Sequence, residues 1–118
     1  MIKIALHGAE FFAYHGFYPE EQKLGNCFLV DIEVRFTPAA DLSEDKIINT
    51  VNYEHLYEIA AEEMKQTKKL IDTVAQSILD KVKARYGFAD NIQVSIKKLN
   101  PPLGCKVEYT NVIISYNK

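Results

Sequence analysis

Residues 28–36 read Phe-Leu-Val-Asp-Ile-Glu-Val-Arg-Phe, and this stretch decides the fold. Every second residue is apolar, and the series runs Phe28, Val30, Ile32, Val34, Phe36. Asp31, Glu33 and Arg35 fall between these positions. Successive side chains of a strand point to opposite faces of a sheet, so this alternation predicts a strand with one face in the core and one in water.

Three weaker strand patterns lie on either side of this stretch. Residues 2–13 alternate in the same way and end where Tyr14-His15-Gly16 interrupts the pattern. Residues 92–96 and 107–116 also alternate, with a proline- and glycine-containing turn at 100–104 between them. Such a turn between two alternating runs is typical of a hairpin. We therefore expect four strands, the last two adjacent.

The segment between the second and third strands has a different period. Apolar residues recur at helical spacing over 53–66, with Asn52 as the N-cap, and again over 71–86, ahead of Gly87. The polar segments around Pro19 and over 38–49 are predicted to be loops. The order strand, strand, helix, helix, strand, strand predicts an α+β fold, in which two helices cover one face of a four-stranded antiparallel sheet.

Composition excludes several classes of protein. With 118 residues, of which 47% are hydrophobic and 25% charged, we expect one globular domain spanning 1–118. A net charge of -2 argues against a nucleic-acid partner. No apolar run approaches the roughly 18 residues of a membrane span, and the first residues do not resemble a signal peptide, so we expect no membrane contact and a cytoplasmic location.

Metal or thiol chemistry is not indicated either. His7, His15 and His55 show no metal-ligand spacing, and Cys27 and Cys105 form no CxxC motif. We therefore expect neither a metal nor a disulfide framework.

So small a domain cannot cover its own sheet. Two helices on one face leave the other face and both edge strands exposed, which is costly unless neighbouring chains cover them. We expect a ring-shaped homo-oligomer.

Four side chains are candidates for chemistry, and each has a structural alternative. Lys98 continues the inward series of 92–96, where partial desolvation would suit a general acid/base, although a lysine that snorkels to the surface fits the same position. Tyr53 either faces a cleft or packs into the core. Glu21 either binds a ligand or is an inert loop residue. Asp72 either pairs with N–H donors of a heterocycle or caps the second helix.

Taken together, these segments resemble one family. They are Tyr14-His15-Gly16, Glu21 ahead of Leu24-Gly25, Asp31, Thr50-Val51-Asn52-Tyr53, Leu70-Ile71-Asp72 and Lys97-Lys98-Leu99-Asn100-Pro101-Pro102. The chain resembles dihydroneopterin aldolase from end to end. The resemblance implies the tunnelling fold, in which four sheets join into a β-barrel ring and two rings usually stack into an octamer.

The resemblance also implies a pterin site between subunits and a reaction without a cofactor. Lys98, Glu21, Ile71 and Asp72 would come from one chain, and Val51 and Tyr53 from its neighbour. The reaction splits 7,8-dihydroneopterin into 6-hydroxymethyl-7,8-dihydropterin and glycolaldehyde. The C=N bond of the dihydropterin takes up the electron pair, so the family needs neither a metal nor a lysine Schiff base.

The family also implies a role for each site residue. Lys98 would be the general acid/base, Tyr53 would exchange a proton with the enamine intermediate, and Glu21 would hold the side-chain hydroxyls or a catalytic water. Asp72 would bind the 2-amino and N3 edge of the pterin, helped by backbone groups near Val51 and Ile71. The family has a glutamate at the position of Asp72, so the carboxylate here is one methylene shorter.

Two alternatives remain open at the level of sequence. One is an epimerase of dihydroneopterin or its triphosphate, which uses the same intermediate. The other is a non-catalytic pterin- or purine-binding protein of the same fold, which would lack the proton-transfer residues Lys98, Tyr53 and Glu21.

Overall fold

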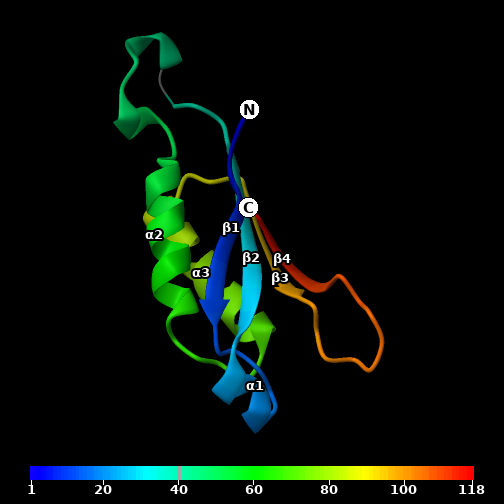
Figure 1. The fold of residues 1–118 in the computed structure, drawn as a ribbon. Coiled ribbons are helices and arrows are strands. Elements are labelled where there is room, and N and C mark those ends of the chain that lie inside the picture. The colour runs from blue at the N-terminus through cyan, green and yellow to red at the C-terminus, as the bar shows by residue number, and fades with distance from the viewer. Residues whose placement is uncertain (40) are drawn as a thin grey trace.

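The strand predicted at residues 28–36 lies inside a four-stranded sheet. A computed structural model describes residues 1–39 and 41–118, and in it β2 (Asn26–Phe36) has neighbours on both sides. The sheet order is β1-β2-β3-β4, with β1 at Ile2–Ala13, β3 at Asn91–Leu99 and β4 at Tyr109–Asn117. Every neighbouring pair is antiparallel, and β3 and β4 form the expected hairpin (Figure 1).

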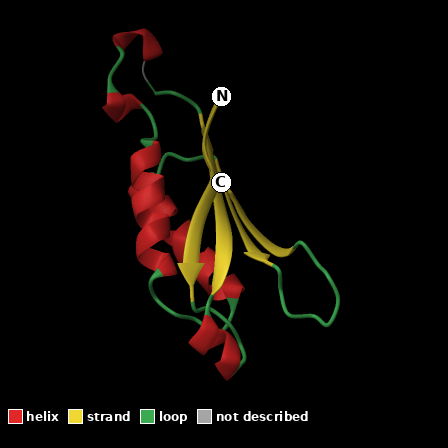
Figure 2. Ribbon diagram, in the orientation of Figure 1, coloured by secondary structure: helices red, strands yellow, loops and turns green. Residues whose placement is uncertain are grey.

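Two long helices cover one face of this sheet, which confirms the α+β prediction. α2 (Tyr53–Met64) packs against β1, and α3 (Ile71–Arg85) packs against β3 and β4 (Figure 2). The alternating apolar residues of β2 and β3 are fully or almost fully buried beneath the helices; they are Phe28, Val30, Ile32, Val34, Phe36, Ile92, Val94 and Ile96. Burying each such side chain contributes about 1.5–3 kcal/mol before entropy is counted.

A bulge in β1 changes the phase of its alternation. Leu6 lies opposite Ile32, but the next pair is Ala9 with Val30, so β1 carries one residue more than β2. Gly8 adopts φ 68° in this bulge, and its N–H donates to Asp31 Oδ1 at 2.6 Å. Glycine adopts a positive φ without steric cost, which suits it to this position.

The ends of the elements differ little from expectation, with one exception. α2 and α3 end at Met64 and Arg85, and Asn52 caps α2 as predicted, because its Oδ1 accepts from the N–H of Glu54 at 2.9 Å.

The exception is the segment around Pro19, which was predicted to be a loop. It forms the six-residue helix α1 (Pro19–Leu24), with the proline in its first turn, where a missing N–H costs nothing. The predicted loop 38–49 contains two short 3-10 turns, Leu42–Glu44 and Ile47–Asn49, and its residue 40 lies outside the described residues.

The second face of the sheet carries charge and no helix. Lys3 and Lys97 pair there with Glu33 and Asp31, and the edge strands β1 and β4 have no outer neighbour in the described chain. The domain is elongated, with extents of 53 × 24 × 23 Å. None of its described helices is long and apolar enough to cross a membrane.

Candidate active site

Lys98 and Glu21 form an ion pair at the end of the sheet next to α1. Lys98 lies opposite Phe28 in the β2–β3 register, on the face that the helices cover, as the even-numbered series predicted. Its Nζ donates to Glu21 Oε2, and the two side chains are only 13% and 17% exposed. Lys98 therefore does not extend to the solvent, and Glu21 is a largely shielded residue of α1 rather than an exposed loop residue.

The pair lines a cleft of about 350 Å³. The other lining residues come from α1, the start of β2 and the turn after β3; they are Glu20, Leu24, Gly25, Asn26, Asn100 and Pro102. A hydrogen-bonded ammonium and carboxylate that are largely shielded from water can accept a proton from one atom of a bound ligand and return one to another. The cleft therefore has the chemistry of proton transfer.

Glu21 reaches Lys98 because residue 16 has no side chain. A Cβ at Gly16 would lie 2.4 Å from Glu21 Cβ and 2.8 Å from its Oε2. The Gly16 carbonyl also accepts from Gln22 Nε2 at 2.9 Å, which fixes α1 against the same residue. The glycine of the Tyr14-His15-Gly16 segment is thus required for the close approach of α1.

Gly16→Ala should therefore disturb the site and the fold together. The added methyl meets Cβ of Glu21, which cannot move away without a shift of α1, and overpacking of this kind typically costs about 1–3 kcal/mol. We expect a lower midpoint of denaturant unfolding and a displaced Glu21. Gly87→Ala is the matched control, because a Cβ there meets nothing within 4 Å. Equal midpoints for the two variants would contradict this account of Gly16.

Ile71 and Asp72 begin α3 at the same end of the domain. Two hydrogen bonds join the loop before α3 to the residues that follow β1. The Gly16 N–H donates to Lys68 O at 3.0 Å, and the Lys68 N–H donates to His15 Nδ1 at 3.1 Å. Asp72 is exposed in the first turn of α3, where its charge suits the helix dipole. It is not the N-cap, however: Leu70 holds that position, and no side chain caps the helix.

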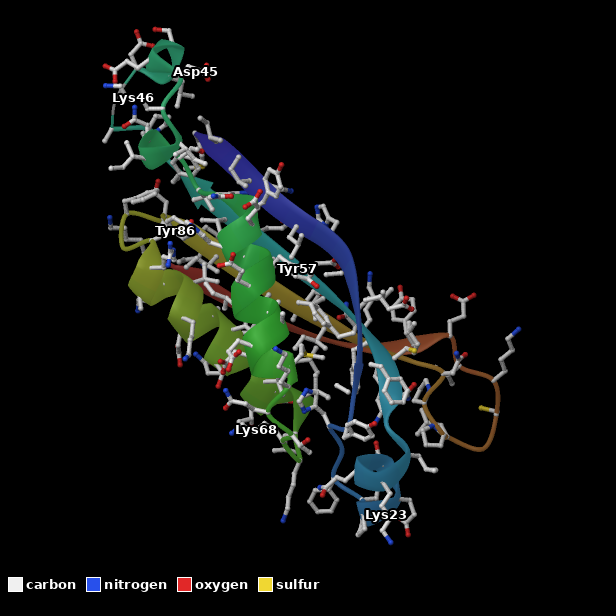
Figure 3. All side chains as sticks on the ribbon, turned by 60° about the vertical axis from the view of Figure 1, so that its left-hand side comes forward. Lys23, Asp45, Lys46, Tyr57, Lys68 and Tyr86 are labelled. Carbon is white, nitrogen blue, oxygen red and sulfur yellow. The ribbon has the colours of Figure 1, made fainter. Side chains whose placement is uncertain are left out.

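Val51 and Tyr53 lie at the opposite end. They precede and begin α2, whose 12 residues run for about 18 Å. The far end of α2 leads to Lys68, which lies near α1 in Figure 3, whereas the start of α2 lies toward Tyr86. Val51 is buried, and Tyr53 is 61% exposed, so Tyr53 does not pack into the core. One chain therefore brings together Glu21 and Lys98, with Ile71 and Asp72 at the same end, but not Val51 and Tyr53.

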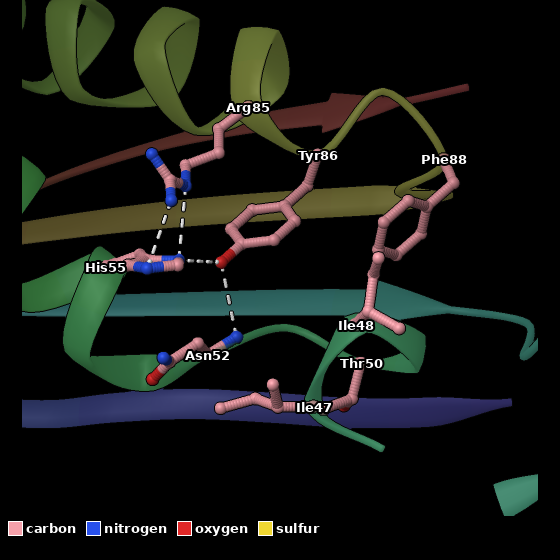
Figure 4. A pocket seen from close by; sticks show the side chains of 8 residues that line it. All are labelled: Ile47, Ile48, Thr50, Asn52, His55, Arg85, Tyr86 and Phe88. Carbon is pink, nitrogen blue, oxygen red and sulfur yellow. Dashed lines mark hydrogen bonds between the residues drawn. The ribbon is translucent and has the colours of Figure 1, made fainter.

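A hydrogen-bonded cluster that the sequence did not predict supports the Val51–Tyr53 segment. The N–H of Asn52 donates to the Tyr86 hydroxyl at 3.2 Å, and that hydroxyl lies 2.7 Å from His55 Nδ1. Arg85 Nε donates to the same His55 nitrogen at 3.1 Å. Figure 4 shows these side chains converging in a pocket of about 580 Å³. His55 and Tyr86 are 31 positions apart in the sequence, and no sequence pattern predicts that they are in contact.

His15 belongs to the Tyr14-His15-Gly16 segment that carries the resemblance, but the sequence predicted no role for it. It is 1% exposed and packs edge-on against Phe28, with 5.5 Å between the ring centroids. Burial lowers the pKa of His15, the nearby charges of Lys68 and Lys98 lower it further, and the carbonyl of Met64 opposes them. The imidazole is therefore neutral at neutral pH, and its Nδ1 can accept the Lys68 N–H.

Within residues 1–39 and 41–118, no group of three or more His, Cys, Asp or Glu side chains is placed to hold a metal ion.

The fold and the cleft define a class of small α+β subunit that is known from solved structures. An Escherichia coli dihydroneopterin aldolase in complex with neopterin superposes with a TM-score of 0.87, covering 99% of this chain and 100% of that one at 17% identity. A Burkholderia dihydroneopterin aldolase bound to guanine superposes with a TM-score of 0.74, covering 99% and 91% at 17% identity. These likenesses establish the fold.

Sequence comparison identifies the family. The family model FolB, dihydroneopterin aldolase, matches residues 4–115. A curated dihydroneopterin aldolase from Streptococcus pyogenes is 36% identical over 104 residues, which cover 87% of each chain. The chain belongs to the dihydroneopterin aldolase family.

Proposed function

We propose that this protein is a folate-pathway lyase that cleaves 7,8-dihydroneopterin into 6-hydroxymethyl-7,8-dihydropterin and glycolaldehyde. The observation that carries the proposal is the shielded Lys98–Glu21 pair in a cleft of a chain that belongs to this family. We assign the activity to a single domain, residues 1–118, acting in the cytoplasm.

The proposed mechanism needs only proton transfer and placement from the protein. A base removes the proton from the C2′ hydroxyl, the C1′–C2′ bond breaks, and glycolaldehyde leaves. The electron pair moves into the C6=N5 bond, giving an enamine that gains a proton at C1′. The Lys98–Glu21 pair would exchange protons with N5 and the side-chain hydroxyls, and Tyr53 would exchange one as the enamine resolves.

The proposed site is shared between two chains of a homo-oligomer, either a tetrameric ring or two stacked rings. Two observations support this. Glu21 and Lys98 lie at one end of the domain and Tyr53 about a helix length away, and the sheet has a face and two edges that the described chain leaves uncovered. Head-to-tail contacts in a closed ring would bring the two ends together.

Asp72 is the proposed anchor for the 2-amino and N3 edge of the pterin. Asp72→Asn would remove the charge from a bidentate contact, and pairs of this kind are worth about 1.5–3 kcal/mol, so we expect pterin affinity to fall about ten- to a hundredfold. Stability should change by less than about 1 kcal/mol, because Asp72 contributes only through the helix dipole. Calorimetry with neopterin on the folded oligomer measures the affinity.

Glu58→Gln is the control for the loss of one charge, because Glu58 is exposed in the middle of α2. Asp72→Glu restores the side-chain length of the family and should bind at least as well as the parent. An unchanged dissociation constant in Asp72→Asn would remove Asp72 from the site and leave the backbone near Ile71 as the anchor.

Product analysis tests the function itself. The purified protein is incubated with 7,8-dihydroneopterin in EDTA, and the products are separated. 6-Hydroxymethyl-7,8-dihydropterin and glycolaldehyde in equal amounts support the proposal. Conversion to the 2′ epimer alone indicates the epimerase, and binding without turnover indicates a non-catalytic protein; either result overturns the aldolase assignment.

A further inference from the structure

His15 has an environment that a purely space-filling residue does not need. It is almost completely buried, and its Nδ1 accepts a hydrogen bond from the Lys68 N–H. The ring therefore joins the buried end of the sheet to the loop between α2 and α3.

The contact of His15 with Lys68 is one half of a two-bond clasp. The Lys68 N–H donates to His15 Nδ1 at 3.1 Å, and the Lys68 carbonyl accepts from the Gly16 N–H at 3.0 Å. Both polar groups of the Lys68 backbone are therefore fixed by two consecutive residues. Three residues later, the same loop begins α3 at Ile71.

The other side of the clasp holds the reactive pair. Gly16 lies in direct contact with the Glu21 side chain and accepts from Gln22, so the position of α1 depends on the backbone at residue 16. The His15 ring packs against Phe28, which lies opposite Lys98 in the sheet. His15 thus contacts both β2, which is paired with the strand that carries Lys98, and the loop that leads to Asp72.

We propose that His15 is a positioning residue that sets the distance between the Lys98–Glu21 pair and the start of α3. The inference rests on the proposed function, because it assigns a purpose to that distance: a pterin must reach Asp72 and the pair at once. The acceptor at Nδ1 is the group in the side chain that holds the loop, because it binds the Lys68 N–H. Burial keeps the imidazole neutral, which leaves the Nδ1 lone pair free to accept.

Three variants separate positioning from packing. His15→Asn places an acceptor oxygen on Cγ, where Nδ1 stands, and keeps the bond to Lys68. His15→Leu has nearly the shape of the asparagine without an acceptor, and His15→Gln carries its acceptor one atom farther out, nearer the place of Nε2. We expect neopterin affinity within about threefold of the parent for His15→Asn and about tenfold weaker for the other two, as one lost hydrogen bond of about 1 kcal/mol or more implies.

Kinetics and hydrogen exchange complete the test. The loss should fall on KM for dihydroneopterin more than on kcat, because Lys98 and Glu21 remain, and amide exchange in residues 65–72 should speed up in His15→Leu and His15→Gln only. If His15→Leu does not fold, comparing His15→Asn with His15→Gln still shows whether an acceptor is needed at the position of Nδ1. Equal affinities in these two variants, or a folded His15→Leu that binds as the parent does, would overturn the inference.

The failure of the proposed function gives a different result. In that case the parent itself would not cleave dihydroneopterin, whether or not it binds neopterin. Exchange in residues 65–72 would still report on the clasp, and faster exchange in His15→Asn than in the parent would contradict the geometric part of the inference independently of any pterin.

Discussion

Lys98→Ala should lower kcat for dihydroneopterin cleavage by about 10²–10⁴, the usual contribution of a general acid/base. The reason is that no other described cation pairs with Glu21, and the ammonium lies in the cleft itself. Stability should fall as well, because the carboxylate loses its partner. A fully buried pair that loses one member costs about 3–5 kcal/mol, and the partial exposure of this pair places the expected loss below that range.

Lys97→Ala is the matched control for this experiment. Lys97 is the preceding residue on β3, but its Nζ lies 3.7 Å from Asp31 and above the Tyr109 ring, on the sheet face that no helix covers. Its removal should leave kcat near the parent value. Steady-state rates on oligomers whose circular dichroism matches the parent measure both variants. A Lys98→Ala protein with more than about a tenth of the parental kcat would contradict the general acid/base role.

Mixing two inactive variants should restore activity. If each site takes Lys98 from one chain and Tyr53 from the next, a ring assembled from equal amounts of Lys98→Ala and Tyr53→Phe subunits contains intact sites wherever the two meet in the right order. Random assembly makes that about one quarter of all sites. Unfolding the two variants together, refolding them and measuring turnover per chain tests the expectation, with mixed rings verified by mass spectrometry.

The control mixture combines Lys98→Ala with Glu21→Gln. Both residues lie at the same end of the chain, so every site in such a ring contains one defect whatever the order of subunits. No activity should return. Recovery in this control, or none in verified rings of Lys98→Ala and Tyr53→Phe, would argue against a site that two chains share.

The fold was largely predictable because its core strands have one strong periodicity each. The alternation in residues 28–36 and 92–96 places every buried apolar side chain of β2 and β3 correctly, and it also places Lys98 on the covered face. The bulge at Gly8 was not predictable in the same way, because a single extra residue leaves both halves of β1 alternating and shifts only their phase.

The site was predictable in part. The resemblance named Glu21 and Lys98, but their direct contact depends on α1, a helix of six residues that is too short to produce a periodic signal. His15, His55 and Tyr86 were missed for another reason. Each acts through a backbone N–H or a ring nitrogen of a residue 31 to 53 positions away, and contacts of that kind leave no pattern in a single sequence.

The separation of Lys98 and Tyr53 at opposite ends of one domain has a thermodynamic consequence. A ligand that fits between such ends touches two chains, so part of its binding free energy also holds the chains together. Its concentration then shifts the balance between free and assembled chains, by about 2.7 kcal/mol per site at a hundred times the dissociation constant. The supply of substrate would regulate the quantity of assembled enzyme as well as its rate.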